Sequence, residues 1–142
     1  MNVLQKMKRV KTRRITFPFP VADTLEGPTI TWDSFSLLLK FTDYQSQQCV
    51  VHFEDVSHYE FLVEDELDSK SYQYDGAVEV INSTLIERLV EIGEVDRSDS
   101  AHFRHIVIGF NEIGAYLVVV CRGFEPRKAE QAVPPKSDRA GG

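Results

Sequence analysis

The sequence predicts an α+β fold: a mainly antiparallel sheet of five to seven strands, strongly curved or split into a sandwich, with one helix at about residues 83–93. Three observations support this prediction. Apolar residues recur with a period of two over most of the chain, which is typical of strands. One segment alone shows the roughly 3.6-residue period of an amphipathic helix. Near the end, Gly114 stands in a short polar break between two long apolar segments, as in a β-hairpin.

The first hairpin is expected over residues 35–54. The buried face of its first strand, 35–41, is expected to hold four alternate apolar residues: Phe35, Leu37, Leu39 and Phe41. The second strand, 49–54, alternates in the same way from Cys49 to Phe53. The connection 42–47 is polar and short, so the two strands should pair directly. After a turn at 55–57, residues 59–63 alternate again and predict a short third strand.

A second hairpin is expected near the end of the chain. It joins His102–Phe110 to Ala115–Phe124 through the loop 111–114. In its second strand, one face is expected to carry Tyr116, Val118, Val120 and Phe124, and the other face is also apolar. Apolar residues on both faces indicate a central strand that is covered on each side.

The helix follows a short strand at 78–81. Leu85, Leu89 and Ile92 lie three or four residues apart and form one apolar stripe. The N-cap is Asn82 or Ser83, or else Thr84, which would form a capping box with Glu87. Gly93 is placed to end the helix.

The two ends of the chain differ from its middle. We expect a basic flexible arm at 1–14, a single α+β domain at 15–125 and a disordered tail at 126–142. Within the domain, 17–20 alternates Phe with Pro, so it should run extended along an edge or over an open end of the core. Residues 29–32 predict an edge strand. One helix cannot cover so many strands, which favours a curved sheet, a sandwich or a homodimer.

Charge is distributed unevenly. Residues 1–14 carry six basic residues and no acidic one, whereas residues 15–121 carry 19 acidic residues and five basic ones. The densest acidic stretch runs from Glu54 to Asp75. It repels phosphate, so nucleic acid is not an expected partner. It is either a recognition surface for a basic protein partner or a solvated loop.

The sequence contains no recognisable catalytic motif, which favours a protein that is not an enzyme. We expect no cofactor and no metal site. His102 and His105 lie three apart, which places them on opposite faces of a regular strand, where they cannot share a metal ion. No nucleotide-binding glycine loop and no nucleophile elbow occurs. Cys49 and Cys121 lie in apolar strands and are expected to be reduced. With no apolar run of signal length after Arg14, we expect a cytoplasmic protein without membrane contact.

Aromatic residues beside carboxylates provide the candidate binding site. The residues concerned lie near loops or strand ends in and around the acidic stretch: Trp32, Tyr59, Glu60, Glu64, Asp65, Glu66, Asp68, Tyr72 and Tyr74. Aromatic rings with carboxylates suit a protein interface or a pocket for an organic cation. The alternative is that these rings close the rim of a β core.

The chain also resembles a known class of proteins in its pattern. The features concerned are the early strands 35–41 and 49–54, the following Tyr59-Glu60-Phe61, and the last hairpin, 104–117, which leads to Phe124-Glu125. They are similar to small bacterial proteins of the polymorphic-toxin immunity type. The resemblance implies a non-catalytic, stoichiometric inhibitor of a toxin, carried on mobile DNA, and the acidic stretch predicts that its protein partner is basic. The alternatives are a small-molecule binder for an organic cation and a protein of unknown function from a mobile genetic element.

Overall fold

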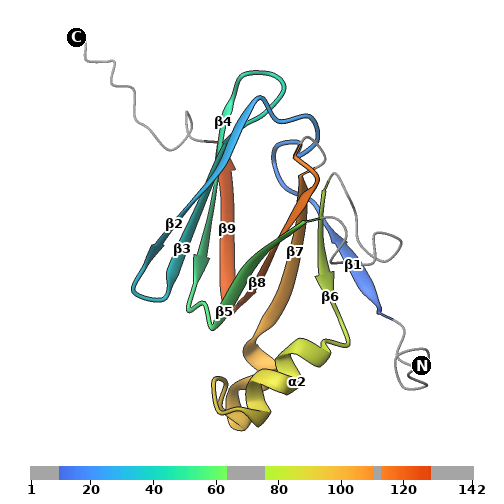
Figure 1. Ribbon diagram of the computed structural model, residues 1–142, viewed down its shortest axis with the longest axis vertical. Helices are drawn as coiled ribbons and strands as arrows, with labels where there is room; N and C mark the ends of the chain where they lie inside the picture. The colour runs from blue at the N-terminus through green and yellow to red at the C-terminus, as the bar shows by residue number, and fades with distance from the viewer. Residues whose placement is uncertain (1–9, 64–75, 111–112, 129–142) are drawn as a thin grey trace.

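The structure is a computed structural model, and it describes residues 10–63, 76–110 and 113–128. These residues form an antiparallel β-sandwich with a small helical cap at one end (Figure 1). The predicted α+β class, mainly antiparallel, is therefore confirmed. Within the described residues, no helix is long and apolar enough to cross a membrane.

The described residues hold nine strands in two sheets, two strands more than the upper limit predicted. The five-stranded sheet has the order β1 (Thr12–Ile15), β6 (Ala77–Val80), β7 (Arg104–Phe110), β8 (Ala115–Cys121) and β5 (His58–Val63). The four-stranded sheet has the order β2 (Glu26–Asp33), β3 (Ser36–Thr42), β4 (Gln48–Glu54) and β9 (Gly123–Lys128). All neighbouring strands are antiparallel.

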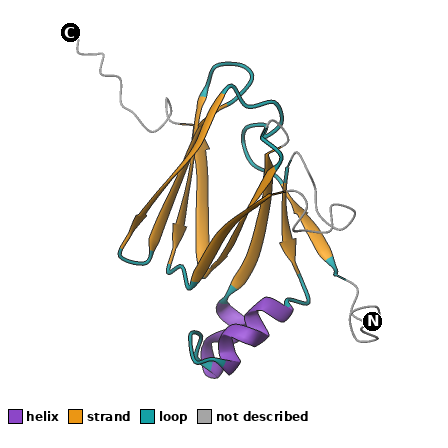
Figure 2. Ribbon diagram, in the orientation of Figure 1, coloured by secondary structure: helices purple, strands orange, loops and turns teal. Residues whose placement is uncertain are grey.

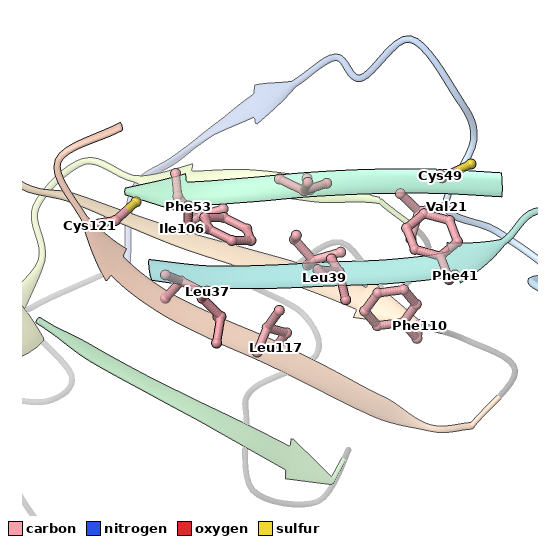
Figure 3. Close-up of a cluster of buried hydrophobic side chains, with 14 of the residues drawn as sticks. Val21, Leu37, Leu39, Phe41, Cys49, Phe53, Ile106, Phe110, Leu117 and Cys121 are labelled. Carbon is pink, nitrogen blue, oxygen red and sulfur yellow. The ribbon is translucent and has the colours of Figure 1, made fainter. Parts of the chain in front are cut away.

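The main core fills the space between the two sheets (Figure 3). Strands β3, β4, β7 and β8 each contribute every second residue to it, as the period of two predicts. From the four-stranded sheet come Leu37, Leu39 and Phe53, and from the other come Ile106 and Leu117, all fully buried. Because each sheet covers the inner face of the other, the number of strands does not by itself require a second chain. The homodimer stays a prediction.

Both predicted hairpins are present. Leu39 faces Val51 in the β3–β4 pair, and Ile108 faces Leu117 in the β7–β8 pair. All seven residues of β8 are buried, so its assignment as a central strand is also confirmed. At the far end of the sandwich, Phe19 of the segment 17–20 packs into the core. Of the two positions predicted for this segment, the structure shows the one over an end of the core.

The C-terminal strand was predicted too long. Beyond Cys121 the chain bends at Arg122 and enters the other sheet as β9, where Phe124 pairs with Phe53. Phe124 therefore does not share a face with Tyr116, as its position in the alternation suggested. Strand β9 continues to Lys128, three residues into the range that was assigned to the tail. Pro126 is compatible with this strand because β9 lies at a sheet edge.

The basic arm also contributes a strand that was not predicted. Thr12–Ile15 form β1, and Arg13 lies opposite Glu79 of β6. The Glu79 carboxylate accepts hydrogen bonds from Arg13 at 2.7 Å and from Arg104 at 2.8 Å. These two guanidinium groups hold the pKa of Glu79 below its ordinary value, with Arg104 the larger influence. Arg13 is therefore part of the folded domain, because it neutralises a mostly buried carboxylate.

The helical cap closes one end of the sandwich (Figure 2). Helix α2 (Thr84–Glu91) begins at Ser83, whose Oγ accepts a hydrogen bond from the Ile86 backbone N–H, so Ser83 is the N-cap. A short 3-10 helix, η2 (Arg97–His102), follows where a strand had been expected to start at His102. Gly93 has φ +86° just after the helix, a left-handed conformation that glycine adopts without strain.

Candidate functional site

Several connections at the helical end of the sandwich line an open cleft. They are the β2–β3 turn, the β4–β5 turn, the β8–β9 bend and the two ends of the segment between α2 and β7, as their positions in Figure 1 show. The cleft has a volume of about 550 Å³. It is lined by Trp32, Phe35, Asp55, Val56, Ser57, Glu94, Phe103 and Arg122, and we call these eight residues the aromatic cleft.

Phe35 occupies a strained position at the rim of the aromatic cleft. Asp33 pairs with Ser36, so Ser34 and Phe35 form a two-residue hairpin turn, and both have positive φ, +49° and +71°. Turns of this kind favour Asn and Gly, because a bulky residue in the left-handed region costs on the order of 1–2 kcal/mol. The Phe35 side chain is nevertheless 68% exposed. Strain combined with exposure points to a role outside the core.

Trp32 and Tyr59 connect the two sheets beside the cleft. Trp32 is the last but one residue of edge strand β2, and Tyr59 lies on edge strand β5 of the other sheet. Their rings stack at a centroid distance of 5.3 Å, and the Trp32 ring also meets Phe35 edge-on at 6.3 Å. All three rings stay partly exposed. The side of the sandwich where β2 and β5 meet thus exposes aromatic rings instead of burying them.

Arg122 places a positive charge inside the cleft. Its guanidinium lies 3.9 Å from the Asp55 carboxylate, 3.8 Å from the Asp99 carboxylate, and 5.5 Å above the Phe103 ring. Both ion pairs are longer than a hydrogen bond. The site thus holds its own guanidinium by the combination of carboxylates and an aromatic face that suits organic cations.

The loops that form the cleft are tied to the sheets by backbone hydrogen bonds. The Val56 N–H donates to the Phe35 carbonyl at 2.8 Å, so the β4–β5 turn holds the strained β2–β3 turn. The Ser57 N–H donates to the Val120 carbonyl at 2.8 Å, and the Arg122 N–H to the Glu54 carbonyl at 3.1 Å. The cleft is therefore fixed to both sheets, which limits the entropy that its residues lose on binding.

Of the nine candidate residues, the structure describes three. It brings Trp32 and Tyr59 into direct contact, as a shared site requires. Glu60 lies on the opposite face of β5, where its carboxylate is 2.7 Å from the His58 ring. The other six lie outside the described residues: Glu64, Asp65, Glu66, Asp68, Tyr72 and Tyr74.

Of the six cleft residues with aromatic or charged side chains, five were not among the candidates: Phe35, Asp55, Glu94, Phe103 and Arg122. Phe35 continues the alternation of Leu37 and Leu39, which placed it on the buried face; this was wrong, because the strand begins at Ser36. The sequence signal that could have placed Phe35 in a turn is Asp33-Ser34 directly before it, because Asp and Ser favour turns. The other four come from connections far apart in the sequence, and no local pattern joins them.

The described histidines do not form a catalytic or metal-binding arrangement. His105 is buried on the outer face of the five-stranded sheet, and its Nδ1 lies 2.8 Å from Ser83 Oγ. Ser83 Oγ also accepts a hydrogen bond from the Ile86 backbone N–H, so His105 contacts the residue that caps α2. Across the described ranges, no group of three or more His, Cys, Asp or Glu side chains lies together as a metal site would need.

Both cysteines are free and buried. Cys49 and Cys121 lie at opposite ends of the core (Figure 3), so they are not strand neighbours that could form a bridge. Burial is the main cause that raises the pKa of each thiol to about 12, and Asp43 contributes at Cys49. At neutral pH both thiols are therefore protonated and poor nucleophiles.

Comparison with known proteins adds no assignment: no family model, no curated protein and no solved structure matches this chain. The chemistry of the aromatic cleft is therefore inferred from its own residues. These are exposed aromatic rings, two carboxylates and one loosely paired guanidinium. Such a set provides surfaces and charges for recognition of another molecule.

Proposed function

We propose that this chain is a non-catalytic, acidic binding protein that recognises a basic protein partner through the aromatic cleft. The observation that carries the proposal is the exposed cluster of Trp32, Phe35 and Tyr59 beside the carboxylates of Asp55 and Glu94. Exposed aromatic residues at a fixed site are typical of the centre of a protein interface. The strained conformation of Phe35 supports the same interpretation, because the residue stays 68% exposed and adds nothing to the buried core.

The cleft favours a cationic side chain from the partner. Arg122 is an internal example, since its guanidinium lies over Phe103 and near Asp55. A second cation would meet the Glu94 carboxylate and the faces of Trp32 and Phe35, which Arg122 does not contact in any described interaction. A cation over an aromatic face is stabilised by roughly 0.5–2 kcal/mol, more as water is excluded.

Net charge supports a basic partner as well. The chain carries a net charge of -6, and residues 15–121 hold 19 acidic residues against five basic ones. Such a field accelerates encounter with a positively charged protein and slows encounter with an acidic one. Together with the resemblance to immunity proteins, this favours a stoichiometric inhibitor of a basic toxin as the form that the function takes.

A small organic cation is the second candidate ligand. The observation that favours it is the cleft volume of about 550 Å³, within the range of roughly 300–1,000 Å³ that small-molecule sites show. The cleft lies open between its loops and its aromatic rim is exposed, which gives a partner protein better access. We therefore rank the protein partner first.

The single tryptophan makes the cleft directly measurable, because Trp32 is the chain's one Trp and lines the site. We would titrate the protein with N-acetyl-arginine amide and, separately, with a basic hexapeptide of alternating arginine and valine, and follow Trp32 fluorescence. Saturable quenching by both probes, tighter for the peptide, is the expected result. Asp55→Asn and Glu94→Gln should each weaken peptide binding about 5-fold, whereas Glu125→Gln on β9 serves as the charge-matched control.

Two results would contradict the proposal. If all three carboxylate variants weaken binding equally, the effect is one of net charge and the cleft is not the site. If neither probe quenches Trp32 at low salt, the cleft does not bind cations. Binding of N-acetyl-arginine amide as tight as that of the peptide would instead favour the small-molecule candidate.

A further inference from the structure

The four edge strands of the sandwich are not equally protected against pairing with another chain. β1 and β5 border the five-stranded sheet, and β2 and β9 border the four-stranded sheet. An edge strand exposes unpaired N–H and C=O groups, and folded proteins commonly protect it with Pro, a β-bulge, a charged side chain, most often Lys, or short length.

Three of these edges carry such protection. β1 is four residues long and contains Arg13 and Arg14. β2 contains Pro28, and its register with β3 shifts between Glu26 and Thr29. β9 contains Pro126 and ends at Lys128.

The fourth edge, β5, has only one of these devices, the charged side chain of Glu60. Its sequence, His58–Val63, contains no Pro, Lys or Arg, and it pairs with β8 in unbroken register from His58 to Val63. Two of its side chains on the inner face, Tyr59 and Phe61, are 39% and 44% exposed. In the described part of the chain nothing pairs with its outer edge.

The β5 edge is continuous with the aromatic cleft. Ser57 lines the cleft, and β5 begins at the next residue, His58. Tyr59 stacks on Trp32, which also lines the cleft. Residues Phe35, Trp32, Tyr59 and Phe61 therefore form a band of exposed rings that leads from the cleft along the margin between β2 and β5.

We propose that an extended segment of the basic partner adds to β5 as a new edge strand, with one of its cationic side chains in the aromatic cleft. This inference rests on the proposed function and specifies how the partner binds. Backbone hydrogen bonds to β5 supply affinity, while the alternation of aromatic and charged residues on β5 selects the side chains. Apolar residues of the added strand pack on Tyr59 and Phe61, and a basic residue faces Glu60 on the other side.

Charge distinguishes this occupant from a second copy of the chain. Two copies, each of net charge -6, repel one another, and an antiparallel self-pairing centred on Glu60 would place two carboxylates opposite each other. A basic segment meets neither penalty. Self-association through β5 is therefore one of the outcomes that the experiment must separate.

The test uses the arginine–valine hexapeptide, acetylated and amidated, with the full-length protein. Hydrogen exchange followed by NMR should show slower exchange for alternate amides of β5 on peptide binding, and no change for β2. Two further peptides, N-methylated at every valine or at every arginine, keep the charge but each lose one set of backbone donors. One of these two should bind at least 10-fold more weakly, because only one set of N–H groups faces β5.

A variant complements the peptides. Phe61→Asn removes an exposed ring and a strand-favouring residue without changing net charge, and should weaken binding about 10-fold. Ile113→Asn, in the loop between β7 and β8 at the other end of the sandwich, is the matched control with a similarly exposed side chain. Urea unfolding confirms that both variants are folded.

Three results would overturn the inference. Equal binding by all three peptides would mean that side-chain charge alone is recognised; the proposed function would then still be decided by the Asp55 and Glu94 variants. Slower exchange on β2 instead of β5 would place the added strand elsewhere. A dimer seen by light scattering that Phe61→Asn dissociates, with no peptide binding, would make a second copy the occupant. Conversely, protection of β5 without any effect of the two carboxylate variants supports strand addition but contradicts the cationic cleft.

Discussion

Acid should destabilise this protein through one buried imidazole, that of His105. The residue is 7% exposed, and its Nδ1 lies within hydrogen-bonding distance, 2.8 Å, of the Ser83 hydroxyl oxygen. Burial lowers its pKa from 6.5 to about 4; the nearby His58 contributes in the same direction, and Glu60 opposes it. Protonation would also disturb Ser83, the N-cap of α2.

The sign and size of the effect follow from linkage. Because the pKa is lower in the folded state, the unfolded chain takes up the proton first as pH falls. The stability that the neutral imidazole provides is complete above pH 6.5 and is lost progressively as pH falls from 6.5 to about 4. Each pKa unit corresponds to about 1.4 kcal/mol, so the total loss is about 3 kcal/mol, with about 2 kcal/mol lost by pH 5.

Urea unfolding at pH 7 and pH 5 measures this effect. Carboxylates also titrate at low pH, but they are the same in every variant and cancel in the comparison. His105→Asn keeps a polar group that can hydrogen-bond with Ser83 and cannot be protonated in this range, so the wild type should lose about 2 kcal/mol more than this variant between the two pH values. His102→Asn, on the exposed η2, is the matched control and should follow the wild type. Identical pH dependence of the wild type and His105→Asn would refute the reasoning.

Three further predictions concern the strained turn, the buried carboxylate and the thiols. Phe35→Gly should change the free energy of unfolding by less than about 1 kcal/mol, because relief of strain offsets the lost ring contact. The same variant should abolish quenching of Trp32 by the basic peptide. As a control, Phe53→Ala in the core should lower the free energy of unfolding by about 3–5 kcal/mol. Glu79→Gln should lower the free energy of unfolding, measured in urea, by about 2–3 kcal/mol, because it leaves two guanidinium groups without their carboxylate. Glu125→Gln on β9 is the control and should change stability little. Cys49 and Cys121 should resist alkylation at pH 8 in the native protein and react fully in urea, and rapid native labelling would contradict their burial.

The sequence predicts much of this fold because most elements have a local cause. Strands β3, β4, β7 and β8 follow the period of two, and the short connections within each hairpin allow only antiparallel pairing. Helix α2 follows its apolar stripe and its cap, and the structure selects Ser83 among the three N-caps considered. These features are decided by residues within a few positions of one another.

Elements that depend on distant residues were not predicted. β1 contains little apolar pattern, and its Arg13 is held by Glu79, 66 residues away. Phe124 continued the alternation of β8, and nothing in the local pattern revealed that the chain would change sheets at Arg122. The cleft residues divide in the same way. Trp32 and Tyr59 could be predicted because aromatic residues near strand ends are common in binding sites. Asp55, Glu94 and Arg122 are distant in the sequence and become neighbours only because the chain crosses between the sheets.

The crossing at Arg122 also determines the order in which the fold can be completed during synthesis. One edge of β4 pairs with β9, which is synthesised much later: Glu54, the last residue of β4, lies opposite Gly123, the first residue of β9. Until the ribosome has released β9, one side of β4 remains unpaired and the β8–β9 side of the cleft does not exist. Pairings between such distant segments form late and slowly. The aromatic cleft should therefore be complete only with the last described strand, and a nascent chain that stops at Cys121 would expose an open sheet edge and lack Arg122 of the cleft.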